Sequence, residues 1–238
     1  MTKVAGLVFA DSMEYGPFLL WAGEKGGKES IRHGNESVEL TLTEGDNALR
    51  VIAVKCGIGK VNAASATAFL IADDKADFIL NAGLSGAIQG LRREDMVAGT
   101  TYIECDFDLT AVGNPLGVKA DGQRYLYEAD GRLLSYALES AGIKKAKCGT
   151  GDIFLADPVK KEFYKNTFSI ESFDMETGAV AAVCDKSGVP MLSVRKISDD
   201  AGDTACDAYR EMNERQEACL TELVENILMR YLRDPDNF

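Results

Sequence analysis

The chain has 238 residues, enough for one substantial core, and 46% of them are hydrophobic and 27% charged. Glycine, proline and serine nowhere gather into a linker, so we expect an ordered single domain over residues 1–238. The formal net charge of -12 disfavours nucleic acid and anionic membranes as partners and suits a small neutral or cationic ligand.

The cysteines and the apolar runs bear on the cellular compartment. No run approaches the roughly 20 apolar residues that span a bilayer, and Val4–Phe9 resembles a strand rather than a basic leader, so we expect a cytoplasmic protein. Six cysteines are scattered singly, and His33 is the one histidine, so zinc binding and Cys–His catalysis are poorly supported. Reduced thiols in an apolar core are the simpler interpretation, and we expect neither a metal nor a cofactor.

Short runs rich in Val, Ile and Leu alternate along the chain with helix-like patterns. The expected strands are Val4–Phe9, Leu49–Val54, Phe78–Leu80, Met96–Ile103 and Met191–Val194. The expected helices are Lys60–Ala72, Gly131–Ala141, Gly178–Ser187 and Thr204–Leu232. Alternating residues between Val38 and Ile52 indicate a hairpin around a Glu-Gly-Asp-Asn turn. We therefore expect an α/β protein of three layers, α/β/α, with a central mixed, mostly parallel twisted sheet flanked by helices.

Ligand-binding loops in such sheets follow the carboxyl ends of the strands. Residues 10–15 include two carboxylates, Asp11 and Glu14, directly after the first expected strand. Either could accept a proton from water. The alternative is a helix start, with Asp11 and Ser12 as capping residues, and this stretch alone favours that alternative.

Two glycine-containing stretches follow later strands. Residues 56–64 enter an alanine-rich helix but match neither the GxxxxGK[ST] nor the GxGxxG pattern, so a nucleotide-phosphate site is weakly supported. In Asn81–Gly86 the glycines could admit a ligand close to the backbone, or could form an ordinary turn between a strand and a helix.

Two further stretches combine acids with other polar residues. In 194–200, Arg195 could pair with a carboxylate, and a buried acid could keep a proton for donation through a raised pKa. The alternative is a surface helix cap made by Ser198 and Asp199. In 173–180, acids precede an alanine-rich helix, and a capped helix start is an equally good explanation.

Six segments in order along the chain carry a family resemblance. They are GIGKVNAA (57–64), NAG (81–83), DLTAVG (108–113), TGDIF (150–154), DMETGAVA (174–181) and VRKISD (194–199). Together they resemble the 5′-methylthioadenosine/S-adenosylhomocysteine nucleosidases, and the similarity runs from Val4 to about Asp200. The resemblance implies a nucleoside phosphorylase-like fold and an enzyme that cleaves the bond between a purine and its ribose.

The resemblance also implies roles for individual residues. Glu14 would activate water, Asp199 would protonate the purine at N7, and Met175 with Glu176 would hold the ribose. The other residues placed at the substrate are Ile58, Leu84, Ser85, Val112, Phe154, Leu155 and Ser198, with Asp11 and Arg195 behind them. Phe154 would stack on adenine, while the backbone of Leu155 would bond the edge of the base.

The chemistry of the bond agrees with these roles. A purine anion is a poor leaving group, so an acid at N7 lowers the barrier, and carboxylates favour the positive charge that develops on the ribose. One acid and one base on opposite sides of the sugar is the arrangement of an inverting glycosidase.

The choice between water and phosphate depends on position 81. Relatives in the superfamily that use phosphate carry an arginine where this chain has Asn81, and Glu14 nearby would repel a dianion. Hydrolysis is therefore expected, although Arg92, Arg93 or a neighbouring subunit could supply cations. A purine nucleoside phosphorylase and a non-catalytic nucleoside-binding protein on the same fold stay open as alternatives.

Three positions depart from the family pattern, and all lie toward the sugar. Leu84-Ser85 stands where a hydroxyl residue usually follows the NxG turn, and Asp11 replaces a methionine near the ribose. Val112 replaces an aromatic residue that crosses the dimer interface to cover the 5′ substituent. The expected partners are a small purine nucleoside and a second copy in a homodimer. The nucleoside itself stays open between methylthioadenosine, S-adenosylhomocysteine, 5′-deoxyadenosine, adenosine and a futalosine-like nucleoside.

Overall fold

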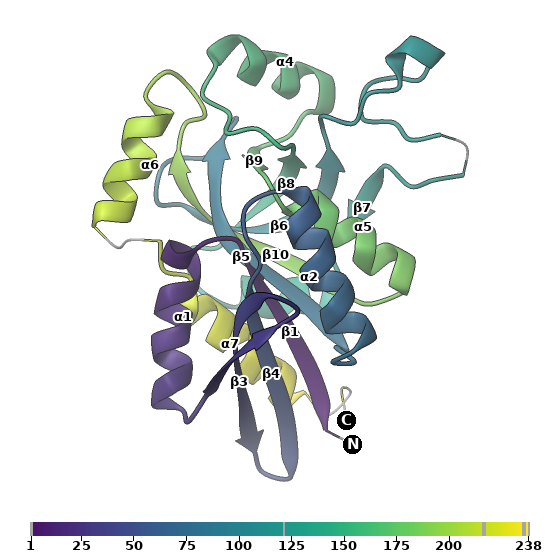
Figure 1. Ribbon diagram of the computed structural model, residues 1–238. Helices are drawn as coiled ribbons and strands as arrows, with labels where there is room; N and C mark the ends of the chain where they lie inside the picture. Colours follow the sequence, from purple (N-terminus) through teal and green to yellow (C-terminus); the bar gives the residue numbers. More distant parts are fainter. Residues whose placement is uncertain (1, 121, 216–217, 235–236, 238) are drawn as a thin grey trace.

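The computed structural model describes residues 2–120, 122–215, 218–234 and 237. Its strands are β1 (Lys3–Phe9), β2 (Lys28–Arg32), β3 (Asn35–Glu44), β4 (Asn47–Lys55), β5 (Phe78–Ala87), β6 (Met96–Glu104), β7 (Leu126–Glu128), β8 (Lys144–Thr150), β9 (Ser172–Asp174) and β10 (Met191–Asp199). Its helices are α1 (Ser12–Glu24), α2 (Lys60–Ala72), α3 (Gly131–Leu138), α4 (Pro158–Phe168), α5 (Thr177–Ser187), α6 (Ala205–Glu214) and α7 (Thr221–Arg233), with a 3-10 turn η1 at Thr110–Val112 (Figure 1).

The strands form one mixed, 10-stranded sheet with β5 at its centre. β5 pairs in parallel with β1 and β10, and its end pairs antiparallel with β9. β10 also pairs with β6, β6 pairs with β8, and β8 pairs with β9. This half of the sheet therefore closes on itself around β5. The other half extends from β1 through β4 and β3 to β2. The closed half brings the ends of β5, β9 and β10 close together.

Helices cover both faces of the sheet, which confirms the expected α/β fold. On β1, Ala5, Leu7 and Phe9 join the apolar cluster that includes α1, α3 and α7, whereas Val4 and Val8 join the cluster with α2 and α5. This follows from the period of two along a strand, which sends alternate side chains to opposite faces. Figure 1 shows α2 and α7 on opposite sides of β1 and β4.

Two strands run further than their sequence patterns predict. β5 and β10 were expected to end at Leu80 and Val194, with ligand-binding turns after them, but both continue for several residues. The reason is their mutual pairing, which runs in parallel from Ile79 beside Met191 to Gly86 beside Asp199. The NAG and VRKISD segments therefore lie largely within strands, and the expectation that these polar residues follow the strand ends is wrong.

The C-terminal helix expected over Thr204–Leu232 is also wrong, because two helices occupy that region. α6 packs against β10, whereas α7 packs against α3, β3 and β4. One straight helix could not reach both places. Residues 216–217 of this stretch lie outside the described residues.

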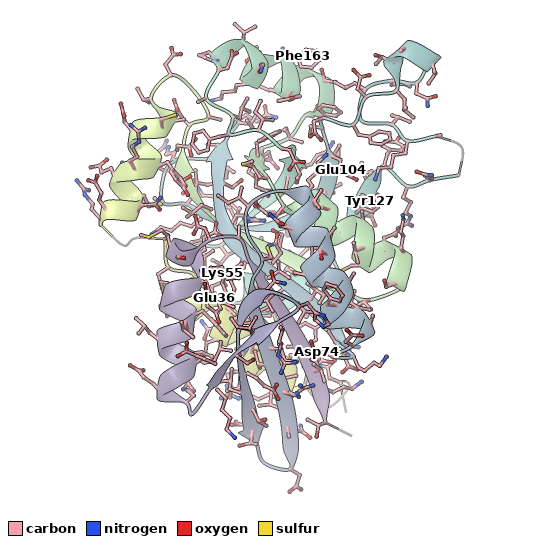
Figure 2. All side chains as sticks on the ribbon, viewed as in Figure 1. Glu36, Lys55, Asp74, Glu104, Tyr127 and Phe163 are labelled. Carbon is pink, nitrogen blue, oxygen red and sulfur yellow. The ribbon has the colours of Figure 1, made fainter. Side chains whose placement is uncertain are left out.

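The hairpin expected between Val38 and Ile52 is confirmed by β3 and β4, whose antiparallel pairing runs to Glu44 beside Asn47. At its other end the ammonium of Lys55 lies 2.6 Å from the carboxylate of Glu36 (Figure 2). Such partly exposed ion pairs contribute little stability each.

Four of the six cysteines have the apolar surroundings that the sequence predicts. Cys56, Cys148 and Cys184 belong to the core beneath α2 and α5, and Cys105 belongs to a smaller cluster near α4. All six cysteines are free, and burial raises the pKa of these four thiols to about 12. Within the described residues, no helix has the length and apolar character that crossing a membrane requires.

Candidate active site

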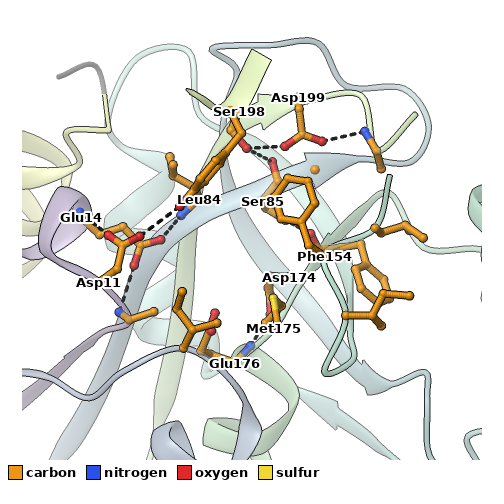
Figure 3. A pocket seen from close by; sticks show the side chains of 18 residues that line it. Asp11, Glu14, Leu84, Ser85, Phe154, Asp174, Met175, Glu176, Ser198 and Asp199 are labelled. Atoms are coloured by element: carbon orange, nitrogen blue, oxygen red, sulfur yellow. Dashed lines mark hydrogen bonds between the residues drawn. The ribbon is translucent and has the colours of Figure 1, made fainter. Parts of the chain in front are cut away.

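A cavity of about 310 Å³ opens at the end of the sheet where β1, β5, β9 and β10 finish. Its lining brings together Glu14 from α1, Glu176 from the start of α5 and Asp199 from the end of β10, which are far apart in the sequence. Figure 3 shows Glu14 on one side of the cavity, Asp199 on a second side and Glu176 on a third. Its volume is in the range of small-ligand pockets.

Most of the other residues proposed for the site line the same cavity. These are Asp11, Ile58, Leu84, Ser85, Phe154, Leu155, Met175 and Ser198. Asp11 was expected behind the site and instead reaches the cavity. Arg195 is fully buried and is not part of the lining. The arginines considered as phosphate ligands, Arg92 and Arg93, do not line this cavity.

Val112 is the exception among the proposed substrate-binding residues, because it does not line the cavity of its own chain. It lies on η1 in a long projecting loop, and 75% of its surface is exposed. The base of that loop is fastened by Lys119, whose ammonium pairs with Glu104 and donates to the Tyr127 hydroxyl at 2.9 Å (Figure 2). Val112 can therefore contact a nucleoside only in the cavity of a partner subunit, and this contact stays a prediction.

Glu14 is positioned by the start of α1. The Asp11 carboxylate accepts hydrogen bonds from the amides of Met13 (2.8 Å) and Glu14 (3.0 Å), so the helix-start interpretation of this stretch is correct. The first turn then carries the Glu14 side chain into the protein, where its carboxylate accepts from the amides of Ala10 (2.9 Å) and Leu84 (2.6 Å). This stretch therefore both caps α1, through Asp11, and contributes Glu14 to the site.

Burial, together with the negative charges of Asp11 and Glu176, raises the pKa of Glu14 to about 8, against the opposing effects of Arg195 and the Leu84 amide. Burial likewise raises the pKa of Glu176 to about 7. The site therefore holds two carboxyl groups whose protonation changes near neutral pH. Such perturbed groups in a cleft are typical of functional sites.

Glu176 is held by two neighbouring segments. Its amide and that of Thr177 donate to the Asp174 carboxylate at 3.0 and 2.9 Å, which orders the start of α5. Its own carboxylate accepts from the amide of Gly59 at 2.9 Å. The glycine turn before α2 has a positive φ of 99° at Gly59, which suits glycine. That turn directs the Gly59 amide at the Glu176 carboxylate. The structure therefore adds no support for a phosphate loop at this turn.

Arg195 supplies the positive charge beneath these acids. Its guanidinium donates to Asn81 and to the Thr177 hydroxyl (2.7 Å), and its Nε lies 3.4 Å from the Asp174 carboxylate. Among the described residues, however, its Nη1 has no hydrogen-bond partner, and the nearest Glu176 oxygen is 4.0 Å away. A buried charged donor without a partner is costly, so this atom needs a further acceptor such as water or ligand.

Gly83 of β5 separates Glu14 from Arg195. A Cβ at this position would lie 2.5 Å from the Glu14 carboxylate and still closer to Nη1 of Arg195. These two polar groups therefore approach the Gly83 backbone closely because Gly83 has no side chain. The glycine of the NAG segment is required here for close approach rather than for a turn.

We expect Gly83→Ala to lower kcat/KM by about a hundredfold, because the new methyl group must displace Glu14 or Arg195. The overpacking should also cost about 1–3 kcal/mol of unfolding free energy. Gly23→Ala is the matched control, since a Cβ at Gly23 in α1 meets no atom of the described residues within 4 Å. Steady-state kinetics and urea unfolding measure both effects. Full activity of Gly83→Ala would show that the close packing is not needed.

Asp199 ends β10, and only 4% of its surface is exposed. Its carboxylate accepts from the Ser198 hydroxyl at 2.6 Å and from the Ala201 amide at 2.7 Å. Burial raises the pKa of Asp199 above its ordinary value in spite of these two bonds. The alternative of a surface helix cap is wrong, because the extended pairing of β10 carries this residue to the cavity.

The raised pKa values of Glu14 and Glu176 predict how stability depends on pH. The folded protein keeps protons on them that the unfolded chain releases above about pH 4.5. Their contribution to the free energy of unfolding is therefore largest below pH 4.5 and is lost as the pH rises to about 8. We expect Glu14→Gln to flatten this fall in urea-unfolding experiments. The same pH dependence in wild type and variant would rule out an unusual pKa at Glu14.

The wall beside Asp199 is mainly apolar and includes residues that the sequence patterns did not identify. Phe154 is 43% exposed at the opening, and its ring meets that of Tyr209 edge to face at 5.4 Å. The Tyr209 hydroxyl donates to the Asp11 carboxylate at 3.0 Å. The other unpredicted lining residues are Ala10, Gly86, Ile153, Phe173, Asp174 and Ala201. Phe173 and Asp174 lie in a stretch already noted for its acids, whereas nothing in the sequence pattern singled out Tyr209.

Comparisons with known proteins agree with this geometry. The family model of the phosphorylase superfamily matches residues 6–229. The 5′-methylthioadenosine/S-adenosylhomocysteine nucleosidase of Geobacillus kaustophilus is 31% identical over 225 residues, which cover 91% of this chain and 94% of the relative. The chain belongs to this nucleosidase family.

Solved structures of the nucleosidase family have the same fold. The Helicobacter pylori 5′-methylthioadenosine/S-adenosylhomocysteine nucleosidase with butyl-thio-DADMe-Immucillin-A has a TM-score of 0.88 and 25% identity, covering 97% of this chain and 99% of the other. A structure described as futalosine hydrolase of Helicobacter pylori has a TM-score of 0.87 at 25% identity and the same coverage. This nucleosidase is thus an N-glycosyl hydrolase, as expected, and hydrolysis is favoured over the phosphorylase alternative.

Proposed function

We propose that this nucleosidase hydrolyses the N-glycosidic bond of an adenine nucleoside, with Asp199 as the acid and Glu14 as the base that activates water. Methylthioadenosine and S-adenosylhomocysteine, for which its relatives are named, are the first substrates to test. The observation that carries the proposal is the meeting of Glu14, Glu176 and Asp199 around one cavity, above a buried arginine with an unpartnered donor.

Asp199 is suited to protonate the leaving purine. Its raised pKa favours the protonated form, and the bonds from Ser198 and Ala201 fix the direction of its carboxyl group. Phe154 beside it offers an aromatic face to the flat base. A proton delivered to N7 turns the purine anion into a neutral leaving group, which lowers the barrier for breaking the bond to C1′ of the ribose.

Glu14 and Arg195 suit a water molecule on the other side of the sugar. The Glu14 carboxylate can accept a proton from that water, while Nη1 of Arg195 can donate to its oxygen. Glu14 acts as a base only when ionised, and a cation-like ribose beside it favours that form. In this proposal Glu176 bonds the ribose hydroxyls and favours the same positive charge.

The remaining parts of the proposal concern the assembly and the compartment. We propose a homodimer in which the exposed loop with Val112 covers the partner's cavity, where Ile58 and Phe154 are 53% and 43% exposed in the single chain. A cytoplasmic location fits the free cysteines, since reducing compartments keep thiols unpaired.

The activity is tested by incubating the protein with methylthioadenosine in phosphate-free buffer and following free adenine. We expect adenine and methylthioribose in equal amounts, at a rate that added phosphate does not change. Strict dependence on phosphate, with a sugar 1-phosphate as product, would instead establish the phosphorylase alternative. Tight binding in calorimetry without any product would favour a nucleoside-binding protein.

A further inference from the structure

One wall of the cavity has polar groups that the proposed chemistry does not use. Asp11 and Tyr209 both line the cavity, and their side chains are joined by the 3.0 Å hydrogen bond from the phenol to the carboxylate. The other Asp11 oxygen holds the first amides of α1, so the carboxylate cannot turn away without uncapping the helix. Figure 3 shows Asp11 directed into the cavity beside Glu14.

The stereochemistry of a β-nucleoside indicates what this wall faces. The base and the 5′ carbon project from one face of the ribose, whereas the 2′ and 3′ hydroxyls and the attacking water lie on the other. Glu14 and Glu176 serve the second face in the proposed reaction. Tyr209 contacts Phe154, whose ring is proposed to face the base, and it also reaches Asp11. Tyr209 therefore extends from the base toward the sugar along the face that carries the 5′ carbon.

Resting on the proposed function, we infer that Asp11 and Tyr209 form a polar subsite for the 5′ substituent. This subsite selects a nucleoside with a 5′-hydroxyl over one with an apolar 5′ group. The Asp11 oxygen that meets Tyr209 has a further lone pair for a hydroxyl proton, and the phenol oxygen can accept as well. An apolar group in the same place would remove water from both polar groups without replacing its hydrogen bonds, which is unfavourable.

The inference is tested with three substrates that differ only at the 5′ position: adenosine, 5′-deoxyadenosine and methylthioadenosine. Tyr209→Phe removes the hydroxyl but keeps the ring against Phe154. Asp11→Asn keeps an amide oxygen for capping α1 while removing the charge. In each variant we expect the ratio of kcat/KM for adenosine to that for 5′-deoxyadenosine to fall about tenfold relative to wild type. Comparing ratios cancels the different intrinsic reactivities of the substrates.

Tyr125→Phe is the matched control, because Tyr125 is 43% exposed and lies outside the cavity lining. Its substrate ratios should equal those of wild type. If Tyr209→Phe and Asp11→Asn change kcat/KM for all three substrates by one common factor, the 5′ subsite is wrong while the nucleosidase activity stands. If wild type releases adenine from none of the substrates, the proposed function fails instead.

Discussion

Asp199→Asn should lower kcat for nucleoside hydrolysis by about 10²–10⁴-fold, the usual contribution of a positioned acid. The amide can still accept from the Ala201 amide, and the Ser198 hydroxyl can rotate to suit it, so the variant should fold like wild type. It cannot transfer a proton to N7. We therefore expect KM to change little while turnover collapses, in a steady-state assay that follows free adenine.

Asp200→Asn is the control for this substitution, because Asp200 is the next residue but is exposed and does not line the cavity. It should keep near-wild-type kcat. Equal losses in both variants would mean that charge in this region, rather than a proton donor at Asp199, determines the rate. Near-normal turnover of Asp199→Asn would remove it as the acid.

Glu14→Gln should reduce kcat by a similar factor of about 10²–10⁴, since the amide cannot take a proton from water. The carboxylate accepts from two backbone amides, those of Ala10 and Leu84, and the glutamine NH₂ group must face one of them. That leaves a buried donor unsatisfied, at a cost of about 1–3 kcal/mol. Thermal unfolding measured beside the kinetics separates this structural effect from the loss of the base.

Glu24→Gln on the same helix is the control, because Glu24 is exposed at the end of α1 and should leave both kcat and the unfolding temperature unchanged. The pH profile gives a second test. Because Glu14 must be ionised, wild-type kcat/KM should rise as the pH approaches about 8, and this limb should disappear from any residual activity of Glu14→Gln. Persistence of the same limb would assign it to another group.

Local patterns in the sequence were sufficient for the layered α/β fold. The alternation on either side of the turn at Glu44–Asn47 and the apolar runs of β1 and β6 identify real strands. The ends of β5 and β10 were not predictable in the same way, because glycine and serine weaken a strand pattern, and only pairing between these two distant segments extends them. Similarly, a helical period alone did not show that α6 and α7 pack on different surfaces.

The site was less accessible to local reasoning, since each acid could also be explained as part of a helix start. Asp11 does cap α1, and Asp174 does order the start of α5, yet Glu14 and Glu176 beside them line the cavity. Capping and chemistry are compatible because a helix start projects its first side chains beyond the end of a strand. The family resemblance, rather than composition or spacing, selected the acids that meet at the cavity, and it did not reveal Tyr209.

The central claim is that one nucleoside occupies this cavity with its base at Asp199 and its ribose between Glu14 and Glu176. A crystal structure of Asp199→Asn with methylthioadenosine tests it most directly. We predict that the purine stacks on Phe154 with N7 toward residue 199, with the ribose hydroxyls bonded to Glu176. A nucleoside bound elsewhere, or in this cavity with its sugar toward residue 199, would contradict the account.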